Sequence, residues 1–516
     1  MKDHAPFSPL KTLSLQMRKL HDQPGLGARC LGVPSFDAQL YQIGQEWLAA
    51  HAEEVGQASD AERKCDVYLA TQLYPFGGHT PLIGDFVEAL GNTVESHLIV
   101  TNVLQLNVSP LPENTQSRTR IGADKTTFLT SASFEERLDE LLRILLTLRP
   151  RRLFLFQHPH DPVAVAACQP WIASQRVLVH HADSIPSFGL FLPGVQIIDL
   201  NPTASSVTRF LGLKSNLLLL TSPDPGPRPV GFLTRGNLVT ATCGGPAKYQ
   251  RLHAHSYAEI VAVILRSTGG WHYHVGQLGG KMLGEIARVL ARENISADRF
   301  IHVEWTPSLS AFLWEQACDV YFSSFPVNGA RTNAEVLASA TPHLRYSERP
   351  ERALMGCGSE IPGGLTWSTP ENLTSVLREV GNRETLEKLS REMRLAYDKT
   401  HHPRVFAGTL ENILAGKNPP EEMELERDKR ALQLLLKTVI HTQQTAWLAP
   451  DVAAEKLDTT HIRLTETLHK QRERIDFLQE QRKRLEQKLT KLESENERRG
   501  KGRSLRARLW RWLTRV

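Results

Sequence analysis

The stretch from Phe322 to Pro342, FSSFPVNGARTNAEVLASATP, contains the features that decide the fold. An apolar segment ends near Phe325, Asn328-Gly329 makes a turn, and the apolar spacing that follows predicts a helix from about Thr332. A strand that passes through a tight loop into a helix is one unit of a parallel α/β sheet. Because the amide hydrogens at a helix start are unpaired, this loop is also a candidate anion site.

The same alternation of short apolar runs and amphipathic segments continues on both sides of this stretch. Between them lies a proline-rich loop, TSPDPGPRPVG, at residues 221–231, which we interpret as an interdomain linker. The alternation predicts an α/β fold of two Rossmann-like domains that face a cleft. The predicted strands are CDVYLATQL, HLIVTNVL, RLFLFQH, RVLVHHA, VQIIDL and NLLLL before the linker, and LVTATC, WHYHVG, RFIHVEW, DVYFSSF and PHLRY after it.

The domain boundaries follow from changes in this pattern. We expect an N-terminal helical segment at 1–62, a first Rossmann-like domain at 63–225 and a second at 226–416. A helix is expected at 417–450, followed at 451–499 by a heptad repeat of leucines that predicts a coiled coil. The alternative for this repeat is a single helix packed on the body of the protein.

The chain of 516 residues carries a net charge of +5, but the charge is uneven. Residues 451–516 hold 18 Lys+Arg and 11 Asp+Glu, so the globular part is nearly neutral and nucleic-acid binding is not favoured there. The tail at 500–516, basic with tryptophans, suits either an anionic membrane surface or an acidic partner.

Neither a membrane span nor an export signal is evident in the sequence. No run of about eighteen apolar residues occurs, and the N-terminus has no apolar core typical of a signal peptide. The six cysteines are scattered singly, so neither a zinc site nor a disulfide framework is indicated. We therefore expect a cytoplasmic protein, peripheral at the inner face of the cytoplasmic membrane if the tail binds lipid.

The opening stretch resembles the C-terminal lobe of the protein O-GlcNAc transferase family and related bacterial glycosyltransferases, which have the GT-B fold. Two departures stand out: Ala330-Arg331 replaces the family's His-Thr, and Ala340 replaces a glycine. The resemblance implies that the second domain binds a nucleotide-sugar donor and that the first binds the acceptor. It rests on Asp319-Val320, Pro326, Asn328-Gly329, Thr332, Glu335 and Thr341-Pro342.

The second domain supplies most of the expected donor-binding residues. Arg331 and Thr332 can add to the anion site at the helix start, which we call the phosphate cradle. Glu335 can accept hydrogen bonds from ribose hydroxyls; the alternative is that its carboxylate is only solvated. The resemblance implies that Lys248, which follows Gly244-Gly245, lies near the diphosphate. There it would offset the negative charge on the leaving group. The alternative is that Lys248 is an ordinary surface lysine. His302 and Trp305 follow a strand where related enzymes hold the base, although Trp305 fits a core position equally well.

The first domain supplies the remaining candidates. Gly77 and Gly78 permit close backbone approach, and His79 can reach the donor phosphate or the acceptor; a structural loop is the alternative. His181 and Asp183 lie in a segment that resembles the family's His-Ala-Asp-His, and with His79 they are the candidate catalytic bases. A zinc site formed by these and the neighbouring His158, His160 and Asp161 is a further alternative, without the spacing of a known metal motif.

Together these features predict a hexosyl- or N-acetylhexosaminyl-transferase that uses a nucleotide-diphosphate sugar, UDP-sugar foremost. No DxD motif is present, so we expect neither a metal nor another cofactor. Retaining relatives carry a second Glu where this chain has Val327, which favours inversion. The expected acceptor is a surface polysaccharide, a glycolipid or a protein, and the coiled coil predicts a homo-oligomer. The alternatives are an inactive GT-B scaffold and a sugar-nucleotide epimerase.

Overall fold

The computed structural model describes residues 8–22, 31–59, 63–91, 94–107, 111–182, 185–249, 255–326, 328–346 and 364–417. All of these belong to one compact unit, Met1–Leu448. The expected helix beyond 417, the coiled coil at 451–499 and the basic tail at 500–516 lie outside the described residues, as do the catalytic candidate Asp183 and Val327.

Seven parallel strands form the first sheet, in the order β3-β2-β1-β4-β5-β6-β7. This order reverses direction between β1 and β4, as in doubly wound nucleotide-binding folds. The strands are β1 (Cys65–Ala70), β2 (Glu95–Val100), β3 (Thr126–Phe128), β4 (Pro150–Phe156), β5 (Gln175–His180), β6 (Gln196–Asp199) and β7 (Ser215–Leu217).

Helices cover both faces of this sheet, because its central strands are apolar at successive positions. Every residue of β1 is buried; Val67 and Leu69 join the core on one face, and Tyr68 and Ala70 join the core on the other. The connecting elements are α5 (His79–Leu90), α6 (Glu113–Gln116), α7 (Phe134–Leu148), α8 (Pro162–Ala166) and α9 (Pro202–Phe210), with short 3-10 turns at Ser117–Thr119 and Ala123–Lys125.

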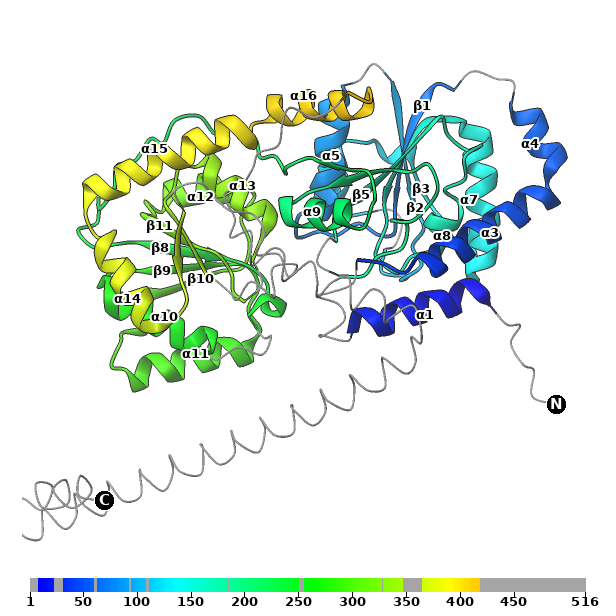
Figure 1. Cartoon of the computed structure of the whole chain (residues 1–516). Coiled ribbons are helices and arrows are strands. Elements are labelled where there is room, and N and C mark those ends of the chain that lie inside the picture. The colour runs from blue at the N-terminus through cyan, green and yellow to red at the C-terminus, as the bar shows by residue number, and fades with distance from the viewer. Residues whose placement is uncertain are drawn as a thin grey trace, which may run out of the picture. The chain divides into compact units, whose positions relative to one another are not determined.

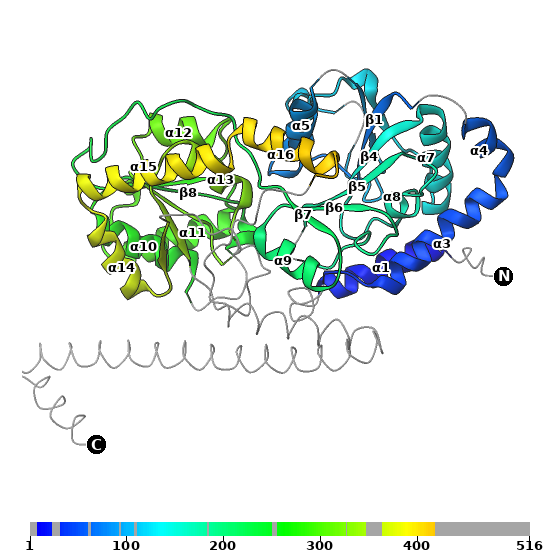
Figure 2. The same ribbon diagram turned by 45° about the horizontal axis from the view of Figure 1, so that its top comes forward.

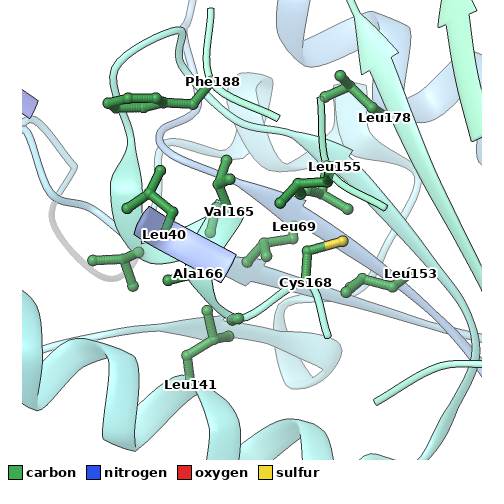
Figure 3. Packing of buried hydrophobic residues seen from close by; sticks show 14 of the residues in the cluster. Leu40, Leu69, Leu141, Leu153, Leu155, Val165, Ala166, Cys168, Leu178 and Phe188 are labelled. Atoms are coloured by element: carbon green, nitrogen blue, oxygen red, sulfur yellow. The ribbon is translucent and has the colours of Figure 1, made fainter. Parts of the chain in front are cut away.

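The N-terminal helices α1 (Pro9–Asp22), α3 (Pro34–Ala50) and α4 (Ala52–Ser59) pack on the first domain. Leu10, Leu13 and Met17 of α1 are buried in the same core as the strands, next to α7 and α8. Figure 3 shows Leu40 of α3, Leu141 of α7 and Val165 of α8 gathered around the β1 and β4 side chains. The first segment of the chain is therefore an extra layer on this domain.

The second sheet has six parallel strands in the order β10-β9-β8-β11-β12-β13. Here the order reverses between β8 and β11, so this sheet repeats the arrangement of the first. The strands are β8 (Thr240–Cys243), β9 (His272–Val275), β10 (Phe300–Val303), β11 (Val320–Phe322), β12 (His343–Tyr346) and β13 (Leu365–Trp367).

Two helical layers enclose this sheet. The helices α10 (Tyr257–Thr268), α11 (Gly280–Arg292) and α14 (Pro370–Glu379) contribute to one core, and α12 (Leu309–Glu315) and α13 (Ala330–Ala338) to the opposite one. Helix α10 begins with a capping box, in which Ser256 and Glu259 satisfy each other's backbone amides. Short 3-10 turns lie at Pro246–Lys248 and Ala297–Arg299.

The last two described helices return the chain to the first domain. Helix α15 (Arg383–Thr400) packs on α13, and α16 (Pro403–Leu414) packs on α5 (Figures 1 and 2). Phe406, Leu410 and Ile413 belong to the core of the first domain, and the Phe406 ring lies 5.5 Å from that of Phe86. The sequence had placed α16 within the second domain, 226–416; its apolar face is buried against the first.

The strands predicted from the sequence on both sides of the linker are present. The short strands β3 and β13 were not predicted, since three residues are too few to show a period. The interdomain linker at 221–231 has neither helix nor strand. Among the described residues, none of the helices combines the length and the apolar character needed to cross a bilayer.

Candidate active site

Ligands in open parallel sheets bind beyond the carboxyl ends of the strands, where the strand order reverses. In the first sheet this point lies between β1 and β4, and in the second it lies between β8 and β11. The loops that leave these four strands begin at Thr71, Gln157, Gly244 and Ser323. Most of the residues selected from the sequence lie in these loops or at the start of the helix that follows.

The loop after β11 folds tightly at the start of α13. It passes through a cis peptide at Phe325-Pro326 and reaches Asn328, whose Oδ1 accepts a hydrogen bond from Gly329 N at 2.7 Å. The Thr332 hydroxyl donates to Gly329 O at 2.9 Å. Asn328 is 9 % exposed, and its amide Nδ2 has no partner among the described residues. An unpaired donor thus lies beside the free amides of a helix start.

Lys248 approaches this same loop from the neighbouring strand. A Cβ added at Gly329 would lie 2.7 Å from Lys248 Nζ and 2.3 Å from Thr332 Oγ1, so a side chain there would displace these groups. Burial lowers the pKa of Lys248, and no carboxylate pairs with its ammonium within the part of the chain described. A half-buried, unpaired cation beside a helix start is a site that an anion would complete.

Arg331 makes a different contact from the one expected. Its guanidinium forms a bidentate ion pair with Asp85 of α5, in which Nη1 donates to Oδ2 and Nη2 donates to Oδ1 at 3.2 Å. Burial raises the pKa of Asp85, and the guanidinium opposes that shift. The predicted phosphate ligand is therefore held in this structure by a carboxylate of the other domain.

Glu335 also has a protein partner. Its Oε2 accepts a hydrogen bond from Leu309 N at 3.0 Å, at the start of α12. Burial raises the pKa of this carboxyl, with Arg331 and Arg118 acting against the rise. Glu335 is half-buried and has a protein partner, and its role toward ribose stays a prediction.

The two aromatic candidates after β10 differ in exposure. His302 Nε2 lies 2.8 Å from Gly276 O, so this ring nitrogen carries a hydrogen and the ring is fixed in orientation. Trp305 is 53 % exposed, so the core alternative for this residue is wrong. An exposed indole at this edge of the sheet remains available for stacking.

In the first domain, the loop from Pro75 to Gly78 carries the two predicted glycines. Gly77 has a φ of +87°, a conformation that favours glycine, and a Cβ added at Gly78 would lie 3.3 Å from Arg331 Cβ. Arg118 donates from Nη1 to Pro75 O at 2.6 Å and from Nη2 to Gly77 O at 2.8 Å. The close approach at Gly78 is to a protein side chain, whereas nothing lies within 4 Å of a Cβ added at Gly77. The loop is fixed by Arg118, which the sequence did not reveal.

His79 and His181 lie together, with ring centroids 4.6 Å apart. His79 Nε2 lies 2.8 Å from Phe156 O, and His181 Nε2 lies 3.0 Å from Gln157 O. Because a carbonyl only accepts, each Nε2 carries the hydrogen and each Nδ1 carries the lone pair. Burial lowers the pKa of both imidazoles, so both are neutral at pH 7 and able to accept a proton.

The neighbouring Asp161 has a structural role. Its carboxylate accepts from Thr71 Oγ1 at 2.6 Å, from Thr101 Oγ1 and from the amides of Val163 and Ala164 that begin α8. Four donors saturate it, so it is not a base. Within the described residues, no three His, Cys, Asp or Glu side chains form a group that could hold a metal ion, so the zinc alternative has no support there.

The sequence missed Arg118, Asp85 and Gln72. Asp85 had a signal, because a carboxylate in the apolar segment LIGDFVEAL predicts a buried partner. Arg118 and Gln72 had none, since Arg118 lies in a short 3-10 turn and Gln72 in a loop, where no periodic pattern marks a residue.

Comparison with known proteins supports the architecture at the level of fold. No family model matches the chain, and no curated protein matches it. The structure of HepE from Anabaena in complex with UDP and glucose is 10% identical, with a TM-score of 0.51 over 68% of this chain and 100% of HepE. A glycosyltransferase from Rickettsia africae is 11% identical, with a TM-score of 0.50 over 69% and 99% of the two chains.

The O-GlcNAc transferase of Thermobaculum terrenum also matches, at 14% identity over 73% of this chain and 69% of that one, but its TM-score of 0.44 is too low to support an argument. The first two matches, with the two parallel sheets, show that the chain has the GT-B fold found in glycosyltransferases. The predicted two-domain fold is confirmed.

Proposed function

We propose that this protein is a glycosyltransferase that transfers a sugar from a nucleotide-diphosphate donor to an acceptor hydroxyl. The observation that carries the proposal is the unpaired ammonium of Lys248 beside the start of α13, next to the unpaired Asn328 amide. These donors converge where the strand order of the second sheet reverses, and together they suit a diphosphate. A UDP-sugar is the donor we propose first, since HepE carries UDP and glucose on this fold.

The first domain supplies the other half of the reaction. Nδ1 of His79, with its lone pair, removes the acceptor proton, and His181 beside it is the second candidate base. The acceptor oxygen then bonds to the anomeric carbon while the bond from that carbon to the diphosphate oxygen breaks. Lys248 and the α13 amides hold the negative charge that develops on the leaving diphosphate. We propose a single displacement, which inverts the anomeric centre, without a metal ion.

We further propose the class of acceptor, the oligomeric state and the location of the protein. The acceptor is a surface polysaccharide, a glycolipid or a protein, and the chain acts as a homo-oligomer at the cytoplasmic side of a membrane. These proposals rest on the sequence of residues 451–516, with its leucine heptads and basic end.

Thermal-shift measurements with a panel of UDP-, GDP-, ADP- and dTDP-sugars test the donor site. We expect one nucleotide sugar to raise the Tm of the full chain, because a ligand that binds only the folded state stabilises it. Lys248→Ala should abolish the shift, and Lys281→Ala, on the exposed side of α11, should retain it. A shift that Lys248→Ala leaves intact would contradict the site, and no shift from any donor would favour an inactive scaffold.

A further inference from the structure

A cavity of about 220 Å³ lies in the first domain beside His79. It is formed at the carboxyl ends of β1, β4 and β5. The apolar surface of the cavity comes from Pro159, Ala182 and Ile185, and its polar lining residues are Thr71, Gln72, Tyr74, His79, His158 and His181. The proposed reaction uses His79 and His181 as candidate bases, and it assigns no role to Gln72 or His158.

Three buried atoms of these side chains have no hydrogen-bond partner among the described residues: Gln72 Oε1, His79 Nδ1 and His158 Nδ1. Gln72 is only 3 % exposed. Its amide oxygen can only accept, and Nδ1 of His79 accepts because its Nε2 hydrogen is used by Phe156 O. Because burying unpaired acceptors costs free energy, the cavity is suited to a ligand that donates several hydrogen bonds.

None of the described residues that line the cavity carries a charge at pH 7. Burial lowers the pKa of His158 to about 3, with His160, His21, His79 and Arg18 adding to the shift. Burial raises the pKa of Tyr74 to about 12, so its hydroxyl stays neutral. Asp161, at the start of α8, is saturated by its own donors. The described residues of the lining therefore offer no charge to compensate that of a phosphate, a carboxylate or an ammonium group.

We propose that this cavity is the acceptor subsite and that it takes a neutral sugar ring, whose hydroxyls donate to Gln72 and His79 and form a hydrogen bond with His158 Nδ1. The inference rests on the proposed function for the identity of the cavity as an acceptor site. Its volume is below the roughly 300–1,000 Å³ of pockets for larger ligands, so it admits about one sugar unit. The sugar-bearing end of a glycan or glycolipid enters, and the rest of the acceptor stays outside.

Saturation-transfer NMR on the full chain without donor tests the subsite directly. The probes are methyl glycosides of neutral hexoses and N-acetylhexosamines, the corresponding 6-phosphates and uronic acids, and a serine-containing peptide. We expect at least one neutral glycoside to bind and the charged sugars and the peptide not to bind. Binding of the charged sugars or the peptide as tight as that of the glycosides, or binding of none of the probes, would overturn the inference.

Variants locate the binding. Gln72→Leu removes one acceptor at nearly constant volume and should weaken the glycoside about tenfold. Gln42→Leu, on the exposed side of α3, is the matched control and should bind normally. Ala182 lines the cavity and is partly exposed, so Ala182→Leu fills part of the cavity and should abolish binding. This variant also tests the location if Gln72→Leu folds poorly. Normal glycoside binding by Ala182→Leu would refute this location.

The donor thermal shift, measured on the same samples, separates the two proposals. A chain that binds a nucleotide sugar but no glycoside contradicts the acceptor subsite and keeps the transferase function. A chain that binds a glycoside in this cavity but no nucleotide sugar contradicts the transferase and keeps a sugar-binding cavity.

Discussion

The two Rossmann-like domains share one strand order but carry opposite chemistry at the same place. Beyond β8 and β11, the second domain presents a cation, a helix start and an unpaired amide donor. Beyond β1 and β4, the first domain presents neutral imidazoles and an amide oxygen, of which His79 Nδ1 and Gln72 Oε1 are unpaired acceptors. The topology determines where a ligand binds, and the loop residues determine which ligand it is. Under the proposed function, the second domain binds the anionic donor and the first binds the neutral acceptor.

The largest expected effect tests the acceptor side. His79→Phe removes the proposed base, so transfer should fall about 10²–10⁴-fold. Donor binding should persist, because the phosphate cradle belongs to the other domain. Initial rates and donor thermal shifts together measure this, with His97→Phe on β2 as the control. If transfer survives in His79→Phe and fails in His181→Phe, the base is His181.

The next effect tests the donor side. Lys248→Met keeps most of the side chain but removes the charge, and kcat should fall about 10²–10³-fold, as for the loss of other preorganised groups that stabilise transition-state charge. Binding of the free acceptor sugar should be unchanged. The same kcat in Lys248→Met and Lys281→Met would show that Lys248 is only a partly buried surface residue.

A third prediction concerns acid stability. Burial lowers the pKa of His272, His274 and His343, in the strands of the second sheet, to about 3. The unfolded chain binds protons at these positions near pH 6.5 whereas the folded chain does not, so stability is lost as the pH falls below about 6.5. At pH 5 the loss is on the order of 2 kcal/mol per histidine.

Hydrogen exchange of β9 and β12 at pH 7 and pH 5, corrected for intrinsic rates, measures this loss. His343→Gln should reduce the difference between the two pH values, and His255→Gln, a partly exposed control before α10, should not. Equal protection at both pH values would contradict the assignment of neutral, buried imidazoles.

The smallest effect concerns the ion pair that joins the domains. If Arg331 exchanges Asp85 for the donor phosphate, Asp85→Asn should lower the donor KM several-fold, while Arg331→Ala should raise it about tenfold. Glu88→Gln, an exposed carboxylate on the same helix, is the control. If Asp85→Asn raises KM as much as Arg331→Ala does, Arg331 serves the contact between the domains.

The sequence by itself determined the alternation of strands and helices, the tight loop before α13 and the residue types at the ends of the central strands. These are local properties, set by periodicity and by the turn chemistry of Asn328-Gly329.

Only the tertiary structure decided which groups are free to act. Lys248 and the histidine Nδ1 atoms are unpaired, whereas Arg331, Glu335 and Asp161 are occupied by partners far away in the chain. It also decided that α16 completes the first domain. Pairing and burial depend on contacts between distant residues, and no local pattern encodes them.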